Sequence, residues 1–184
     1  MILQTKRLMI RDWNPSNDAV AAFDIYGDLA VMHYIREPEK SIETVQTYLE
    51  KRVERDRRCH NGTGSWPVIE QQTGELIGAI LLQQLPDNQG NLTQDFEIGW
   101  HFRRSHWGQG FATEAAERII DYGFQVLHLP ILYAVVKPEN QRSIRVTQRL
   151  NMEPLGRTNQ YYGVELLLFG LTEITIIYHN AKTQ

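Results

Sequence analysis

The chain has 184 residues, 42% of them hydrophobic, and a formal net charge of -3 at pH 7. This length suits one substantial core, so we expect a single domain over residues 1–184. The charge shows no basic excess, which argues against nucleic acid as a partner. Cys59 is the only cysteine, which excludes an internal disulfide and a cysteine-rich zinc site and favours a reducing, cytoplasmic location. Charged residues interrupt the apolar N-terminal segment, so neither a signal peptide nor a membrane span is predicted.

The N-terminal third predicts one strand and two helices. Leu8, Ile10 and Trp13, with charged residues before Trp13, indicate a strand, and NPSND then supplies turn and N-cap residues for a helix from about Ser16. A second helix is predicted from about Ser41, because apolar residues recur there at helical spacing. NGTGSWP, residues 61–67, is typical of a loop.

A hairpin is predicted next, with strands over residues 68–70 and 76–82 and its turn at Thr73 and Gly74. Nearer the C-terminus, residues 143–150 predict a short helix. The apolar run over residues 165–177 predicts a final strand pair or one long strand.

The central segment predicts a strand, a glycine turn, a helix and a second strand. Residues 96–102 alternate between an apolar and a polar face, 110–127 have helical periodicity, and 131–136 are continuously apolar. The two strands of such a unit are expected to be parallel. Gly108 and Gly110 would let an anion approach backbone N–H groups at the helix start, although a glycine pair can also be only a tight turn.

Three segments, taken in order, resemble the GNAT superfamily of N-acetyltransferases and, within it, the RimJ/RimL-like branch. They read LQTKRLMIRDW, FEIGWHFRRSHWGQGFATEA and KPENQRSIRVTQRLNMEPLG. The resemblance spans nearly the whole chain. It implies a mixed α/β (α+β) fold, in which helices flank a central, mostly antiparallel mixed sheet that splays between parallel strands at residues 96–103 and 131–136. It also implies acetyl-CoA as the cofactor, bound in that cleft.

The resemblance further implies a set of cofactor-binding residues. Backbone atoms of Phe102 and Arg104 match the positions that pair with the pantetheine arm and the acetyl carbonyl, although many relatives have proline in place of Arg104. Asn140 matches an asparagine that contacts the cofactor chain, and Ser143 follows it in the N-x-x-S pattern of the branch. The pyrophosphate loop falls on Trp107, Gly108, Gln109, Gly110, Phe111 and Ala112.

Acetyl transfer to an amine requires a general base, because an amine at neutral pH is mostly protonated. Glu97 is the first candidate, since the family frequently uses a glutamate on this strand; alternatively it pairs with a neighbouring Arg or Lys. His101 is a weaker candidate. The N–H group of Phe102 would stabilise the oxyanion. Direct attack needs no covalent enzyme intermediate and no metal.

The departing thiolate also needs a proton or a hydrogen bond. Where many relatives have a tyrosine, this chain has Thr147, so Ser143 becomes the favoured donor. Ser143 could instead cap a helix beside Asn140. Tyr161 and Tyr162, in a predicted turn, and bulk water are further alternatives, and the tyrosines could line the acceptor pocket.

The resemblance leaves more than one class of acceptor open. The branch includes enzymes that acetylate protein N-termini, notably of ribosomal proteins, and others that act on small amines or antibiotics. The loops at residues 38–41, 86–93 and 159–163 would border the acceptor, and a homodimer is an open prediction. A different class of protein, a non-catalytic acetyl-CoA sensor, would use the same fold.

Overall fold

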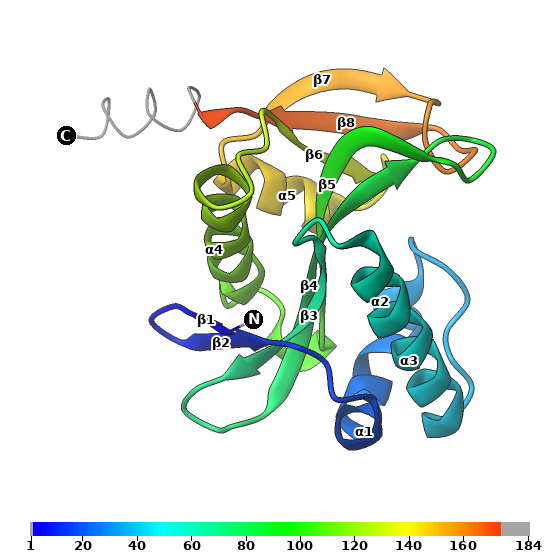
Figure 1. Cartoon of the computed structure of the whole chain (residues 1–184), viewed down its shortest axis with the longest axis vertical. Helices are drawn as coiled ribbons and strands as arrows, with labels where there is room; N and C mark the ends of the chain where they lie inside the picture. Colours follow the sequence, from blue (N-terminus) through cyan, green and yellow to red (C-terminus); the bar gives the residue numbers. More distant parts are fainter. Residues whose placement is uncertain (1, 174–184) are drawn as a thin grey trace. The chain divides into compact units, whose positions relative to one another are not determined.

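An eight-stranded sheet is the framework of the computed structural model, which describes residues 2–173 (Figure 1). The strand order is β1-β2-β3-β4-β5-β6-β8-β7. Strands β5 and β6 are parallel, with Glu97 opposite Tyr133, whereas the β1–β2, β2–β3, β6–β8 and β7–β8 pairs are antiparallel. The predicted mixed, mostly antiparallel sheet is confirmed. The strands are β1 (Ile2–Gln4), β2 (Leu8–Arg11), β3 (Gly64–Glu70), β4 (Leu76–Pro86), β5 (Leu92–Phe102), β6 (Leu132–Val136), β7 (Glu153–Thr158) and β8 (Leu166–Leu171).

Side-chain caps set where the first helices begin. Asn14 accepts a hydrogen bond from the Asn17 N–H group at 3.3 Å, and Ser41 accepts one from Thr44, also at 3.3 Å. The predicted starts near Ser16 and Ser41 are therefore confirmed within two residues. The helices are α1 (Pro15–Tyr26), α2 (Leu29–Met32), α3 (Ile42–Cys59), the 3₁₀ turn η1 (Arg104–His106), α4 (Phe111–Gln125) and α5 (Gln141–Arg149). No helix within residues 2–173 is long and apolar enough to cross a membrane.

The chain divides into two compact units, each with its own buried residues. Unit 1 comprises Met1–Leu81 and Trp100–Arg118, and unit 2 comprises Leu82–Gly99 and Ile119–Gln184. Strands β4 and β5 and helix α4 contribute residues to both units. Buried side chains of unit 1 include Trp13, Ile25, Tyr26, Met32 and Leu49, and those of unit 2 include Leu82, Ile98, Phe124, Leu132 and Phe169. The single domain expected over residues 1–184 stays a prediction.

One expectation about strands was wrong, and one strand near the C-terminus was not predicted. Residues 64–67 are not loop but the first half of β3, because Trp66 is buried and the Ser65 N–H group donates to Asp56 Oδ2 at 2.9 Å. Burial and hydrogen bonding there override the glycine and proline turn signals. The C-terminal apolar run forms one strand, β8, whose partner β7 was not predicted. Residues 174–177 of that run lie outside the described residues.

Strand β7 escaped prediction because its sequence, EPLGRT, contains proline and glycine. The strand lies at the end of the sheet order, and its register shifts between Pro154 and Gly156. Edge strands and bulges are the positions where a sheet tolerates these residues. The short elements β1 and α2 were also missed, whereas the hairpin at Gly74, the helix after Gly110 and the parallel β5–β6 pair agree with prediction.

Gly78 on β4 should be intolerant of a side chain, because a Cβ atom there would lie 2.4 Å from Cδ1 of the buried Phe102 ring. We expect Gly78→Ala to lower the free energy of unfolding by about 1–3 kcal/mol through overpacking. The matched control is Gly123→Ala, whose Cβ would lie 3.1 Å from a terminal methyl group of Leu132. The Leu132 methyl group has to move only slightly, and alanine is more favourable than glycine within a helix by about 1 kcal/mol. Urea unfolding compares the two variants, and equal losses would contradict this account.

Candidate functional site

The loop before α4 turns through two glycines in the left-handed region, with φ of 77° at Gly108 and 84° at Gly110. Glycine adopts this conformation without the steric penalty of a Cβ atom. A Cβ at Gly108 would meet no atom within 4 Å, so this side of the loop is open. The first N–H groups of any helix have no intrahelical acceptor, and the helix dipole favours an anion beside them. The loop therefore fits a phosphate group.

Side chains within the loop hold it against the rest of unit 1, to which the loop belongs. Trp107 donates from Nε1 to the Phe102 carbonyl at 2.8 Å, and its ring packs against the core of that unit. Gln109 donates from Nε2 to the Ser105 carbonyl at 3.0 Å. Phe111, the first residue of α4, is buried. The loop shape is thus fixed by its own residues and by the end of β5.

Arg104, whose backbone the resemblance assigns to the cofactor, lies on the surface of unit 1. Its Nε atom is 3.6 Å from Asp28 Oδ2, and its side chain is largely exposed. An exposed ion pair of this kind is weak, so Arg104 keeps much of its freedom to contact an anion. Ala112, the last residue of the predicted pyrophosphate loop, follows Phe111 in the first turn of α4, and its contact with the cofactor stays a prediction.

An arginine that sequence reasoning missed also holds this loop. Arg7 donates from Nη1 to the Gln109 carbonyl at 3.0 Å, and its Nε atom lies 2.6 Å from Glu114 Oε2. Its guanidinium carbon lies 4.3 Å from the centroid of the Phe111 ring. Thr5 and the backbone N–H group of Arg7 both donate to Glu114 Oε1, at 2.5 and 2.9 Å. The β1–β2 ribbon accordingly lies beside the start of α4 (Figure 1).

The Glu114 carboxylate is what fixes this arginine. Burial alone would raise the pKa of Glu114, but hydrogen bonds from Thr5 and Arg7 outweigh it, so that its pKa lies below the usual value. The ionised carboxylate holds the guanidinium so that Nη2 is 3.4 Å from where a Cβ of Gly110 would be. Arg7 therefore places a positive charge directly at the glycine loop.

In unit 2, Glu97 is buried, with 7% of its surface exposed. The alternation along β5 predicted a polar face here but not the burial of this residue. Oε1 of Glu97 accepts a hydrogen bond from Gln83 Nε2 at 2.8 Å and another from the Tyr162 hydroxyl. A buried carboxylate needs such donors, because it loses its hydration. Glu97 is thus held by β4 and by the loop before β8.

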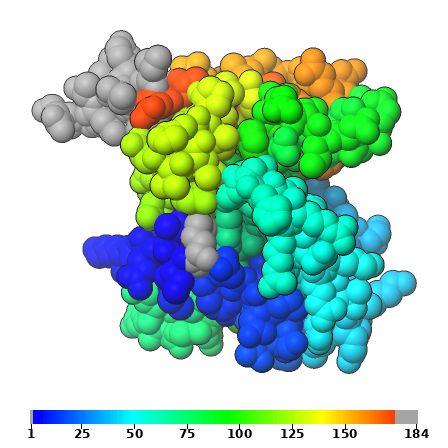
Figure 2. All heavy atoms as spheres, viewed as in Figure 1, coloured from blue at the N-terminus to red at the C-terminus, as the bar shows by residue number. Residues whose placement is uncertain are grey.

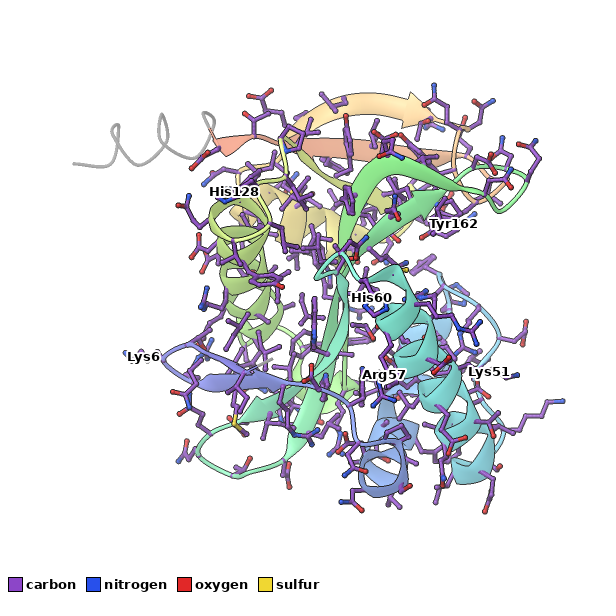
Figure 3. All side chains as sticks on the ribbon, in the orientation of Figure 1. Lys6, Lys51, Arg57, His60, His128 and Tyr162 are labelled. Atoms are coloured by element: carbon purple, nitrogen blue, oxygen red, sulfur yellow. The ribbon has the colours of Figure 1, made fainter. Side chains whose placement is uncertain are left out.

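The two adjacent tyrosines of that loop have different environments. Tyr161 is buried, and its hydroxyl donates to Asp95 Oδ2 at 2.7 Å; burial and this bond raise its pKa. Tyr162, which is labelled in Figure 3, is exposed, and its hydroxyl donates to Glu97 Oε1. Both tyrosines were alternative proton donors to the departing thiolate. In the structure, the hydroxyl of Tyr161 is bound to Asp95 and that of Tyr162 to the candidate base, Glu97.

The N-x-x-S pattern forms the start of α5. Asn140 is the N-cap, and its Oδ1 atom accepts from the Ser143 N–H group at 3.2 Å. Ser143 is half-buried. Thr147 is fully buried and donates to the Ile144 carbonyl at 2.8 Å, which is a local helix contact. The catalytic role of Ser143 and the cofactor contact of Asn140 stay predictions.

His101, the weaker candidate base, is packed edge-on against Tyr26 with 5.9 Å between ring centroids. Burial, followed by the positive charges of Arg52 and Arg36, lowers the pKa of His101 to about 3. The imidazole is neutral at physiological pH and a poor proton acceptor. This environment counts against a role as general base.

Known proteins share this sequence and fold. Residues 7–153 match the model of the Acetyltransferase (GNAT) domain family. A Bacillus subtilis (strain 168) protein named Uncharacterized N-acetyltransferase YnaD is 32% identical over 156 residues, which cover 85% of each chain. Spermidine N(1)-acetyltransferase of Escherichia coli (strain K12) is 32% identical over 101 residues, covering 55% of this chain and 52% of its own. A solved acetyltransferase (GNAT family) from Bacillus anthracis has a TM-score of 0.77 and 25% identity, covering 95% of this chain and 99% of its own.

The chain therefore belongs to the GNAT acetyltransferase family and is an acyltransferase of the N-acetyltransferase kind. The superfamily expected from the three sequence segments is confirmed. Enzymes of this family generally use acetyl-CoA, whose pyrophosphate suits the open glycine loop with its neighbouring arginine.

Loss of Arg7 should weaken coenzyme A binding. Arg7→Ala removes both the bond to Gln109 and the charge beside Gly110, and hydrogen bonds of charged groups are worth about 1.5–3 kcal/mol. We expect a dissociation constant for coenzyme A at least about tenfold higher by titration calorimetry. Arg58→Ala is the control, since Arg58 pairs with Glu54 on an exposed face of α3. Equal affinities in the two variants would show that Arg7 has no part in cofactor binding.

Proposed function

We propose that this N-acetyltransferase moves the acetyl group of acetyl-CoA directly to a primary amine, with Glu97 as the general base. The observation that carries the proposal is the buried carboxylate of Glu97, held on β5 by the amide of Gln83 and the hydroxyl of Tyr162. A carboxylate in such an environment is a typical proton acceptor of enzyme active sites.

Each part of the cofactor has proposed contacts. The glycine loop, residues 107–112, and Arg7 would hold the pyrophosphate, while Asn140 and the backbone of Phe102 and Arg104 would hold the pantetheine arm. Acetyl-CoA supplies the activated acetyl thioester. The Phe102 carbonyl already accepts a bond from Trp107, so only the second lone pair of this oxygen is left for the pantetheine arm.

Glu97 has to remove a proton, since the acceptor amine is protonated at neutral pH. The Phe102 N–H group donates to the acetyl oxygen as negative charge develops there. Ser143, in the first turn of α5, donates to the departing sulfur. Each of these groups acts on a different atom. Removing one of them should therefore change the pH dependence of the rate in its own way.

The acceptor we place first is the N-terminal amine of a protein, of the ribosomal kind acetylated by the RimJ/RimL-like branch that the three sequence segments resemble. A polyamine is the second candidate, because the spermidine enzyme of Escherichia coli is 32% identical over the shared segment. The cytoplasmic location and the homodimer expected from the sequence stay predictions.

Binding of acetyl-CoA should raise the melting temperature of the protein. At 100 times its dissociation constant, a ligand stabilises the folded state by about 2.7 kcal/mol. For a chain of this size we expect a rise of about 5–10 °C. Gly110→Val should abolish the rise, because a branched side chain would occupy phosphate space and distort the loop.

The control for that variant is Gly74→Val in the β3–β4 turn. Gly74 has a φ of 74°, close to the 84° of Gly110, and no neighbour within 4 Å of its Cβ position. Both valines impose the same kind of backbone strain, and only the one at residue 110 lies at the loop. If Gly110→Val keeps the full rise with acetyl-CoA, the glycine is only a turn residue.

Catalysis is tested first with a panel of N-terminal peptides, polyamines and small aromatic amines, measuring release of coenzyme A. With the best acceptor, Glu97→Gln should lower the rate about 10²–10⁴-fold at neutral pH. Higher pH should restore part of the rate, because solution then supplies the free amine.

The loss of rate in Ser143→Ala should persist at high pH, since departure of the thiolate does not depend on amine protonation. If either variant has the rate of the parent protein at every pH, the residue changed in that variant has no part in the mechanism.

A further inference from the structure

The candidate base and the residue that contacts it differ sharply in exposure. Glu97 is 7% exposed, whereas Tyr162, whose hydroxyl donates to Glu97 Oε1, is 43% exposed. An acceptor amine arriving from solvent therefore meets the phenol more readily than the carboxylate. The hydrogen bond already points the phenolic proton at the base.

Gln83 joins the same cluster. Its Nε2 atom is 2.8 Å from Glu97 Oε1 and 3.4 Å from the Tyr162 hydroxyl. Gln83 and its neighbour Gln84 are the polar side chains of the strand sequence LIGAILLQQLP, and a polar group in such a strand needs a partner. The amide thus fixes the carboxylate oxygen that receives the phenolic hydrogen bond.

The backbone holds Tyr162 in an unusual conformation. Its φ is 59°, in the left-handed region that bulky residues rarely occupy, and Gly163 follows at 66°. Asn88 braces this turn: its Oδ1 atom accepts from the Gly163 N–H group at 2.9 Å, and its Nδ2 atom donates to the Asn159 carbonyl at 2.8 Å. Strained residues of this kind concentrate at functional sites.

The bracing loop belongs to unit 2, like the rest of the cluster. Residues 87–91 connect β4 to β5 and form an exposed green lobe in Figure 2. Tyr162 is labelled next to this loop in Figure 3, in agreement with the bonds of Asn88. The position of the phenol is therefore set by two loops that hold each other.

We propose that Tyr162 is a catalytic residue that takes the proton of the acceptor amine and passes its own proton to Glu97. The inference rests on the proposed role of Glu97 as base. As the N–H bond of the ammonium breaks, a new O–H bond forms on the Tyr162 oxygen, and the original phenolic proton moves to Glu97 Oε1. Tyr162 stays neutral, and Glu97 ends protonated. The reverse transfer later returns the proton through the exposed phenol to water.

Two other titratable residues, Asp95 and Tyr133, lie near this relay in the sheet. Asp95, two residues before Glu97 on β5, accepts the hydrogen bond of Tyr161 at 2.7 Å. Tyr133 on β6 is opposite Glu97 in the parallel pair, and burial followed by Asp95 raises the pKa of Tyr133. Tyr161 therefore offers a matched control: it is the adjacent tyrosine, and its hydroxyl serves a different carboxylate.

The experiment compares Tyr162→Phe, Tyr161→Phe, Glu97→Gln and the double variant Glu97→Gln/Tyr162→Phe in coenzyme A release with the panel's best acceptor. A relay predicts that Tyr162→Phe and Glu97→Gln each lose about 10²-fold or more at neutral pH and partly recover at high pH. The double variant should be no slower than the slower single variant, because both changes break one proton path. Tyr161→Phe should keep a rate within a few-fold of the parent.

Melting curves with and without acetyl-CoA accompany the kinetics, and an unchanged acetyl-CoA shift shows that each variant folds and binds cofactor. If Tyr162→Phe has the rate of the parent protein while Glu97→Gln is slow, the relay is overturned and Glu97 acts as a direct base. Losses that multiply in the double variant also overturn it, since the residues then act independently. A parent-like Glu97→Gln instead refutes the proposed base itself, so the two failures are distinguishable.

Discussion

The parallel pairing of β5 with β6 is the constraint on which the site depends. Antiparallel neighbours can be joined by a tight turn, but a parallel pair requires a crossover, and here α4 supplies it. The chain leaving β5 must therefore start a helix soon afterwards. The short segment between them contains Gly108 and Gly110, so the fold itself produces a helix N-terminus preceded by an open glycine loop.

The parts of this arrangement that are local in sequence could be predicted. Periodicity identified α4 and β6, and the glycines indicated the loop, because each signal lies within one element. Arg7 could not be assigned in this way. Its partner Glu114 is 107 residues away, and the pairing of β2 with β1 and β3 brings the arginine to the helix. A contact over that separation leaves no periodic signal.

The candidate base shows a second limit of sequence reasoning. Alternation along β5 put Glu97 on a polar face, and alternation reports only which side chains share a face, not what covers that face. The covering groups come from β4 and from the loop before β8, as Gln83 and Tyr162. Gln83 did carry a signal, as a polar residue in a strongly apolar strand. Tyr162 lay in a correctly predicted turn, but a turn does not specify where its side chains reach.

The partners of the two key glutamates indicate different roles. Glu114 is bound by the guanidinium of Arg7, and this cation must be left unpaired if the carboxylate takes up a proton. Such a carboxylate is suited to holding a loop. Glu97 receives hydrogen bonds from an amide and a phenol, which are neutral, so protonation breaks no ion pair with either of them. The phenol can also reverse its bond and accept from a protonated Glu97, which an arginine cannot do. The cationic donor of Glu114 thus suits a structural role, whereas the neutral Gln83 and Tyr162 donors suit the proton-accepting role that we propose for Glu97.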